Sequence, residues 1–227
     1  MNLNTIKPNS EKALFLAKRQ LPELVYDAVN LEGIHYTLPE VQTLLDGITV
    51  GGHRQNDQII TLNQANAWQF LFDSIHDKTF NLSKDFCCQL HKVAAQTEAL
   101  TWGEFRTGGV TIAGSPYTPP IASELNNHWR ALCQQLTGIN DPYDQAIYLF
   151  LQMARHQFFY DVNKRMGRFM MNGLLLQSGY PVINLPASQQ ETFNTLMLDF
   201  YVSNDTEPMT EFMKNFLDPR IIDIMSE

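Results

Sequence analysis

The stretch "ARHQFFYDVNKRMGRFMMNG", residues 154–173, places a group of charged and polar side chains between two strongly apolar flanks. The flanks have helical spacing, so they predict two helices joined by a short loop. The second helix would begin with unpaired backbone N–H groups and a partial positive charge, which favour a bound anion. Lys164 and Arg165 fall in its first turn, where this charge disfavours cations, and Arg168 follows about one turn later. A polyanion bound at this helix end would account for all three cations.

A carboxylate precedes the second helix. Asp161 stands just before the predicted anion site, and Mg²⁺ commonly takes one or two carboxylates together with phosphate oxygens. Asn163 can donate from its side-chain amide to a phosphate oxygen. The residues therefore predict a site for Mg²⁺ and a di- or triphosphate. A solvated basic helix start, capped by Asp161, explains the same residues without a ligand, and the pattern alone leaves both explanations open.

The composition restricts the class of protein. The 227 residues suffice for one large domain or two small ones, and the formal net charge of −8 argues against a general nucleic-acid binder. The three cysteines, two of them adjacent, predict free thiols in a reducing compartment. The first residues show no apolar signal segment, and no run approaches the roughly 18 apolar residues of a membrane span. We therefore expect a cytoplasmic protein that binds neither membrane nor nucleic acid.

Helical spacing dominates the rest of the chain. Pro22 is expected to break the first helical run, and Thr37 and Glu40 have the spacing of a capping box. The predicted helices cover residues 11–31, the stretch from Thr37 to Gly47, and residues 62–77, 83–97, 121–136, 142–157, 163–178, 187–202 and 208–217. The sequence thus predicts an all-α domain.

One segment departs from this pattern. In residues 105–120, "FRTGGVTIAGSPYTPP", Val110 and Ile112 alternate with small residues between glycines, which is typical of a short β-hairpin or flap. Arg106 is expected to be solvated beside this flap. His91 shows no metal-binding spacing and is expected to be structural.

The central stretch resembles the signature of the Fic (Fido-domain) family, His-x-Phe-x-Asp/Glu-Gly-Asn-Gly/Lys-Arg-x-x-Arg. The matching residues are Phe159, Asp161, Asn163, Lys164, Arg165 and Arg168. The flap segment, "NDTEPMTEFM" and "NLEGIHYTLPEVQTLLDG" also resemble parts of this family, so the resemblance covers most of residues 25–215. It implies the all-α Fic/Fido fold with a small β-hairpin flap. A helical region over residues 1–82, with an inhibitory segment at about 25–50, would pack with a core domain over 83–218 as one compact unit.

The resemblance also implies an activity, which is transfer of AMP from ATP to a protein hydroxyl with Mg²⁺, the reaction of a protein adenylyltransferase. In this family the motif His is the general base and the acid holds Mg²⁺, a role that falls on Asp161. The nucleotide would be bound by Asn163, Lys164, Arg165, Gly167 and Arg168. The protein substrate would dock at the flap, along Val110, Thr111 and Ile112. Proteins of this family are often dimers, so a homodimer is one of the expected assemblies.

The signature departs from the family at its catalytic position. Counting back from Asp161, the motif His belongs at position 157, where this chain has Gln157, and His156 lies one residue early. A shift of one residue turns a helical side chain by about 100° and moves it about 1.5 Å. Glutamine cannot take the proton, so either a bulge returns His156 to the site, or the chain is a catalytically impaired module that binds nucleotide or protein. Val162 replaces the motif Gly, and a β-branched residue disfavours positive φ.

The segment "AVNLEGIHYT" resembles the inhibitory motif Ser/Thr-x-x-x-Glu-Gly of the family. Glu32 and Gly33 match, whereas Ala28 replaces the hydroxyl residue. The resemblance implies that Glu32 pairs with Arg168 and blocks the γ-phosphate, which would remove the cation that orients the triphosphate. The alternative is that Glu32 is a surface residue near a helix end.

Overall fold

Helices build this chain from one end to the other. The computed structural model describes residues 3–227, and no strand occurs among them. In chain order the helices are η1 (Leu3–Thr5), α1 (Ser10–Arg19), α2 (Leu21–Leu31), α3 (Leu38–Leu45), α4 (Gln55–His76), α5 (Lys84–Ala94), η2 (Ala122–Glu124), α6 (Leu125–Leu136), α7 (Pro142–His156), α8 (Asn163–Gln177), η3 (Ala187–Gln189), α9 (Gln190–Ser203), α10 (Glu207–Lys214) and α11 (Pro219–Ser226). The predicted all-α class is confirmed.

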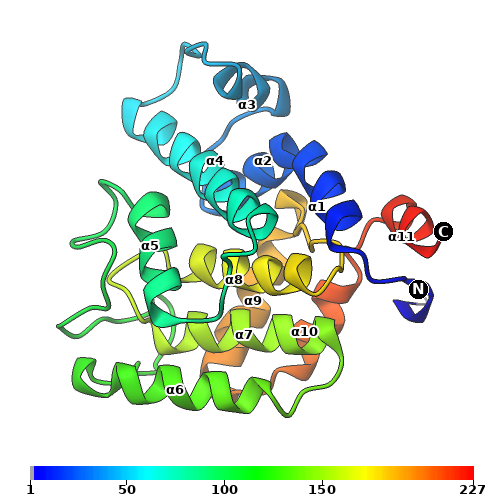
Figure 1. Cartoon of the computed structure of the whole chain (residues 1–227). Coiled ribbons are helices and arrows are strands. Elements are labelled where there is room, and N and C mark those ends of the chain that lie inside the picture. Colours follow the sequence, from blue (N-terminus) through cyan, green and yellow to red (C-terminus); the bar gives the residue numbers. More distant parts are fainter. Residues whose placement is uncertain (1–2) are drawn as a thin grey trace.

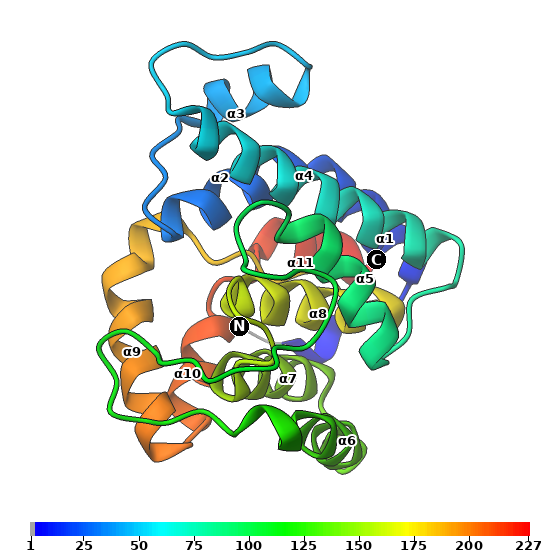
Figure 2. The ribbon, with the colours of Figure 1, turned by 90° about the vertical axis from the view of Figure 1, so that its left-hand side faces the viewer.

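The centre of the fold is the pair α7 and α8, which the signature stretch joins. Their connection is short, so they pack along each other in opposite directions (Figure 1). Gly167 lets them approach closely, because a Cβ atom there would lie 2.8 Å from the Phe150 carbonyl oxygen. Helices α1, α2, α4 and α5 cover one side of this pair, and α6, α9 and α10 cover the other (Figures 1 and 2). The core pair therefore fixes the signature loop between two layers of helices.

Local sequence signals place several helix ends. Helix α3 begins with the predicted capping box, in which the Thr37 side chain accepts from the Glu40 N–H and Glu40 accepts from the Thr37 N–H. Helix α1 ends at Arg19 and α2 begins at Leu21 with Pro22 in its first turn, as the predicted break requires. Gly33 follows α2 with φ +81°, a conformation that glycine adopts without strain.

The predicted hairpin is absent, and this part of the prediction is wrong in the described chain. Residues 105–121 form an irregular loop in which the Ser115 N–H to Ile112 carbonyl bond, 3.1 Å, is a local turn rather than a strand ladder. The backbone of Arg106 is bonded instead to the Phe158 carbonyl, at 2.9 Å. The loop reaches α9, where Gly114 lies next to Leu198 (Figure 2). Its short apolar alternation finds no partner strand.

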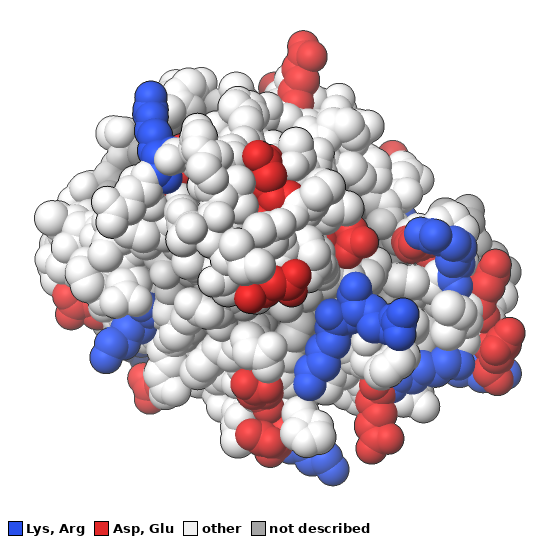
Figure 3. All heavy atoms as spheres, turned by 90° about the horizontal axis from the view of Figure 1, so that it is seen from above, with Lys and Arg blue, Asp and Glu red and all other residues white. Residues whose placement is uncertain are grey.

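One helix boundary and one whole helix differ from the prediction. Helix α4 begins at Gln55, earlier than the predicted residue 62, and α11 was not predicted. The three cysteines are free thiols, as predicted. Within the described range, no helix combines the length and apolar character needed to cross a membrane. Seen from above, acidic and basic side chains are scattered singly or in small groups over a largely uncharged surface (Figure 3).

Candidate active site

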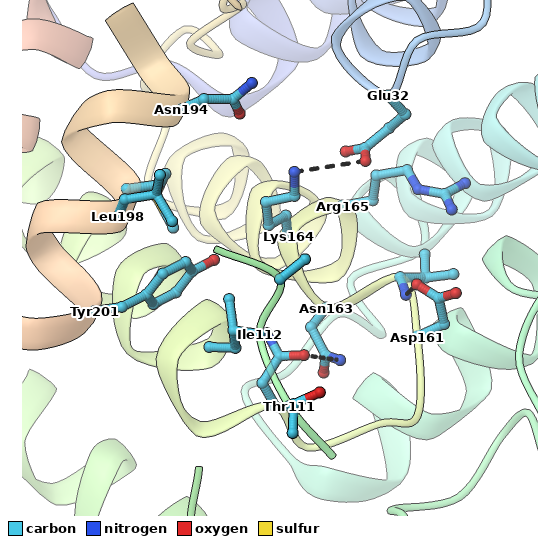
Figure 4. Close-up of a pocket in the computed structure, with 14 residues that line it drawn as sticks. Glu32, Thr111, Ile112, Asp161, Asn163, Lys164, Arg165, Asn194, Leu198 and Tyr201 are labelled. Atoms are coloured by element: carbon cyan, nitrogen blue, oxygen red, sulfur yellow. Dashed lines mark hydrogen bonds and ion pairs between the residues drawn. The ribbon is translucent and has the colours of Figure 1, made fainter. Parts of the chain in front are cut away.

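A cavity of about 480 Å³ opens where the signature loop meets the irregular loop and α9. This volume falls within the range of small-molecule sites. Residues predicted for the site line much of it, namely Glu32, Thr111, Ile112, Gln157, Asp161, Asn163, Lys164 and Arg165 (Figure 4). Sequence reasoning missed the wall that α9 supplies, which consists of Asn194, Met197, Leu198 and Tyr201. These residues have ordinary helical spacing and carried no separate signal.

A partly buried ion-pair cluster closes one end of the cavity. The carboxylate of Glu32, at the end of α2, lies 3.2 Å from Arg168 Nη2 and 3.6 Å from Lys164 Nζ. Burial alone raises the pKa of Glu32, but Lys164, Arg168 and Arg165 outweigh it and lower that pKa below its ordinary value. The structure thus contains the pairing of Glu32 with Arg168 that the family resemblance implied. Figure 4 shows the second contact of this ionised carboxylate, with Lys164 in the first turn of α8.

Arg165 has a partner that the sequence did not indicate. Its guanidinium binds both carboxylate oxygens of Glu98, at 3.1 and 2.5 Å, and both side chains are more than nine-tenths buried. A buried cation needs such a counter-charge, because removing an unpaired charge from water is costly. Arg165 was predicted to bind phosphate, and in this structure its guanidinium is held by Glu98 while the residue still lines the cavity.

Gln157 directly follows α7 and lines the cavity. Its backbone is left-handed, with φ 50° and ψ 63°, and this conformation ends the helix. Both polar atoms of the side chain are hydrogen-bonded, because Nε2 donates to the Ala154 carbonyl at 2.6 Å and Oε1 accepts from Asn163 Nδ2 at 3.0 Å. Asn163 also donates to the Phe159 carbonyl, so both of its amide hydrogens are used within the loop. Its predicted role as a phosphate donor would require these bonds to rearrange.

His156 lies outside the cavity lining. Its Nδ1 makes a 2.7 Å hydrogen bond to the Gln152 carbonyl one turn back, and its ring lies 4.8 Å from that of His128. Burial lowers the pKa of His156 to about 4, so the ring is neutral near pH 7. The bulge that would return this imidazole to the site is not formed, since α7 continues regularly to His156 and turns only at Gln157.

His91 packs against the loop before α8 and contacts its residues Phe159 and Asp161. Its ring is fully buried and stacks on Phe159 with centroids 3.7 Å apart. Nδ1 accepts from the Gly103 N–H, so the proton is on Nε2, which faces the Asp161 carbonyl at 3.4 Å. Val162 keeps the left-handed conformation, φ 64°, which costs a β-branched residue about 1–2 kcal/mol. The loop therefore has a left-handed residue at the position where the family motif has glycine.

Asp161 is the lining residue with the properties of a magnesium ligand. Its side chain is exposed at the cavity, and Oδ1 accepts from the Val162 N–H at 2.7 Å. Among residues 3–227 no group of three His, Cys, Asp or Glu side chains could hold a metal ion. The single carboxylate of Asp161 would suit Mg²⁺, which takes its remaining ligands from phosphate oxygens and water.

Arg106 is buried, which corrects the expectation that it is solvated. Only 2% of the residue is exposed, and its guanidinium donates to the carbonyls of Gln157, Gly108 and Pro120 at 2.6, 2.7 and 2.5 Å. It thereby fastens both ends of the irregular loop to the signature loop. The remaining predicted residues, Gly33, Val110, Gly167 and Arg168, lie outside the cavity lining.

These features define an all-α domain with a polar site at the start of its central helix. Residues 81–175 match the model of the Fic/DOC family. Two curated relatives, each named "Protein adenylyltransferase Fic", come from Drosophila persimilis and Drosophila mojavensis. They are 25% and 24% identical over 90% and 83% of this chain. The chain spans about two fifths of the length of these relatives, 41% and 38%.

Solved structures share the fold. A Fic domain containing signaling protein from Bacteroides thetaiotaomicron has a TM-score of 0.78 at 19% identity, covering 98% of this chain and 91% of that one. Fic-1 from C. elegans has a TM-score of 0.76 at 18% identity, covering 90% of this chain and 61% of that one. The chain therefore contains a Fic/DOC family domain over residues 81–175 and shares the fold of solved Fic-domain structures.

Proposed function

We propose that this chain is a Fic-type protein adenylyltransferase domain that uses ATP and Mg²⁺ and is inhibited by its own Glu32. One observation carries the proposal, which is that the carboxylate of Glu32 lies against Arg168 and Lys164 at the start of α8. An anion already occupies the place that a triphosphate would need. Two cations gathered at a helix N-terminus are favourable only with such an anion present.

The remaining lining supports the nucleotide part of the proposal. Asp161 would hold Mg²⁺, which when bound neutralises charge on the phosphate oxygens. Lys164 would turn from Glu32 to the phosphates once the carboxylate leaves. The α9 wall, with Met197, Leu198 and Tyr201, offers an apolar surface for the rest of a nucleotide.

The protein acceptor would lie along the irregular loop. Val110 and Thr111 make no backbone–backbone hydrogen bond within the described structure, so their N–H and C=O groups are available to an extended segment. Thr111 and Ile112 face the cavity, which would place an acceptor hydroxyl near the nucleotide. Strand addition to this loop would supply main-chain hydrogen bonds without requiring a particular acceptor sequence.

A second candidate function, a nucleotide- or protein-binding module without transferase activity, is favoured by the catalytic position. Gln157 lines the cavity where a base is needed, and His156 is bonded to the Gln152 carbonyl outside it. An amide cannot accept the proton of a hydroxyl acceptor near neutral pH. The two candidates share the nucleotide site and differ in the transfer step.

An assay with labelled ATP distinguishes the two candidate functions. The purified chain and its Glu32→Gly variant are incubated with Mg²⁺ and ATP labelled on the α-phosphate, which AMP retains when pyrophosphate leaves. The first candidate predicts label on protein that increases in Glu32→Gly. If label is lost in Glu32→Gly with His156→Ala, His156 is the base, and if it survives, His156 is excluded. Nucleotide binding without any transfer supports the second candidate, and absence of nucleotide binding by Glu32→Gly contradicts the first candidate and the nucleotide-binding form of the second.

A further inference from the structure

A second, much smaller cavity lies behind Arg168. It is lined by α2, α4, α8 and residues 183–185, and it leaves about 30 Å³ of space that water can occupy. A buried water needs roughly 10–15 Å³ by this measure, so the space suffices for one or two molecules. Ala28, Gln64, Trp68 and Arg168 are among its lining residues. The cavity thus adjoins the cation that binds Glu32.

Three buried polar atoms of Gln64 and Arg168, two of the lining side chains, have no hydrogen-bond partner in the described structure. Gln64 is 1% exposed, and neither its Oε1 nor its Nε2 makes a hydrogen bond in the described structure. Arg168 Nη2 binds Glu32, whereas its Nη1 is buried and unpartnered. Buried polar groups in folded proteins are nearly always hydrogen-bonded to protein or to ordered water. Two such side chains on one cavity indicate a ligand between them.

The hydrogen-bond donors and acceptors of these atoms indicate which ligand fits between them. Arg168 Nη1 and Gln64 Nε2 need an acceptor, and Gln64 Oε1 needs a donor. An anion can only accept, and it would also face the carboxylates of Glu32 and Asp27, which already act on Arg168. Water both donates and accepts and carries no charge. Exchange of the amide oxygen and nitrogen of Gln64 would leave this requirement unchanged.

We propose that a buried water site links Gln64 to Arg168. The water accepts from Arg168 Nη1 and donates to Gln64, so that Gln64 becomes a positioning residue for the guanidinium. Arg168 is then held from two sides, by Glu32 at Nη2 and by the water at Nη1. When Glu32 leaves, the water bridge keeps the guanidinium in place. Only this last consequence rests on the proposed nucleotide site.

The first test needs no nucleotide. A crystal structure of the unaltered chain, at a resolution that shows ordered water, is expected to contain density between Arg168 Nη1 and the Gln64 amide. The same density should vanish in Gln64→Met, which keeps the length of the side chain but removes both polar atoms. A dry cavity, or a Gln64 amide bonded directly to Arg168 or to another protein group, would overturn the water site.

The second test measures the positioning role by calorimetric titration of Mg²⁺–ATP into Glu32→Gly. Adding Gln64→Met is expected to weaken binding by roughly three- to tenfold, the effect of one lost hydrogen bond. Gln69→Met is the matched control, because Gln69 lies on the exposed face of the same helix α4. Equal affinities in the Gln64 and Gln69 variants would overturn the positioning role. If Glu32→Gly itself binds no nucleotide, the proposed function fails while the crystallographic test still decides the water site.

Discussion

Replacing Gln157 by His should create or greatly increase transferase activity. Gln157 occupies the lining position at the end of α7, with backbone angles in the left-handed region. Histidine is one of the residues that tolerate this region better than most. The substitution puts a titratable imidazole at the cavity, where His156 does not reach. It is best made in Glu32→Gly, so that the nucleotide site is free.

The magnitude follows from what the side chain gains and loses. The imidazole gives up the bonds of Gln157 to Ala154 and Asn163, each worth about 1 kcal/mol, so the variant should be about 2 kcal/mol less stable. A positioned general base typically accelerates proton transfer by about 10²–10⁴-fold. Because the stability cost does not unfold a typical domain, we expect a gain of at least about 100-fold in transfer rate.

The assay is the initial rate of AMP transfer from ATP labelled on the α-phosphate, measured as a function of pH. With His at position 157 the rate should rise with pH through a midpoint near 6.5, as the imidazole loses its proton. Gln157→Asn is the matched control, since it accepts the same backbone conformation but cannot act as a base. Equal rates for the His and Asn variants, with nucleotide bound to both, would refute the assignment of this position to the proton-accepting step.

Three further predictions concern stability and mobility. Glu98→Gln should cost about 3 kcal/mol of unfolding free energy in urea titration, because it leaves the buried Arg165 without its counter-charge; a loss below about 1 kcal/mol would contradict this. Arg106→Met should accelerate amide hydrogen exchange in residues 107–120 by roughly 10- to 100-fold, since it removes charge-assisted bonds to three carbonyls; unchanged exchange would show that the loop is held by other contacts. Burial lowers the pKa of His91 to about 4, so its contribution to stability is complete above the unfolded value near 6.5 and is lost as pH falls toward 4. The wild-type chain should therefore lose about 3 kcal/mol over this range on account of His91. His91→Gln should remove this part of the fall in the urea-derived profile and leave the part due to His156, whose pKa burial also lowers to about 4; an unchanged profile would contradict the assignment.

The sequence predicted the helices best where local signals determine them. The apolar flanks of the signature stretch predict α7 and α8 to within about two residues of their observed ends, because both helices bury wide faces in the core. The break at Pro22 and the capping box at Thr37 depend on neighbouring residues alone, and both were correct. The helix α11 was missed although Asp218 caps its start and Ile221, Ile222 and Met225 share one buried face.

The flap shows why the remaining structure could not be predicted. Alternation at Val110 and Ile112 predicted a hairpin, yet a hairpin also needs a second strand to complete its hydrogen bonds. In the structure the loop is fastened by Arg106 to carbonyls as far along the chain as Gln157. A single arginine beside a glycine pair carries no sign of this distant partner.

The contacts of the candidate site were likewise predicted only in part. The pairing of Glu32 with Arg168 was predicted through the family resemblance, and the structure contains it. The pairing of Arg165 with Glu98 joins residues 67 positions apart in the chain and has no local signal. The amide of Asn163 was predicted to face phosphate, and the structure uses it to hold Gln157 and Phe159. Only the folded chain shows which polar groups are already satisfied.

The central claim is that the Glu32 carboxylate fills the place of a triphosphate beside Arg168 and Lys164. Calorimetric titration of Mg²⁺–ATP into the unaltered chain, Glu32→Gln and Glu32→Gly tests it most directly. Removing a partly buried carboxylate from two cations at 3.2 and 3.6 Å should change the free energy of binding by about 1.5–3 kcal/mol, or roughly 10- to 100-fold in Kd. The account predicts tighter binding in both variants. Equal affinity in all three proteins, or binding only to the unaltered chain, would contradict it.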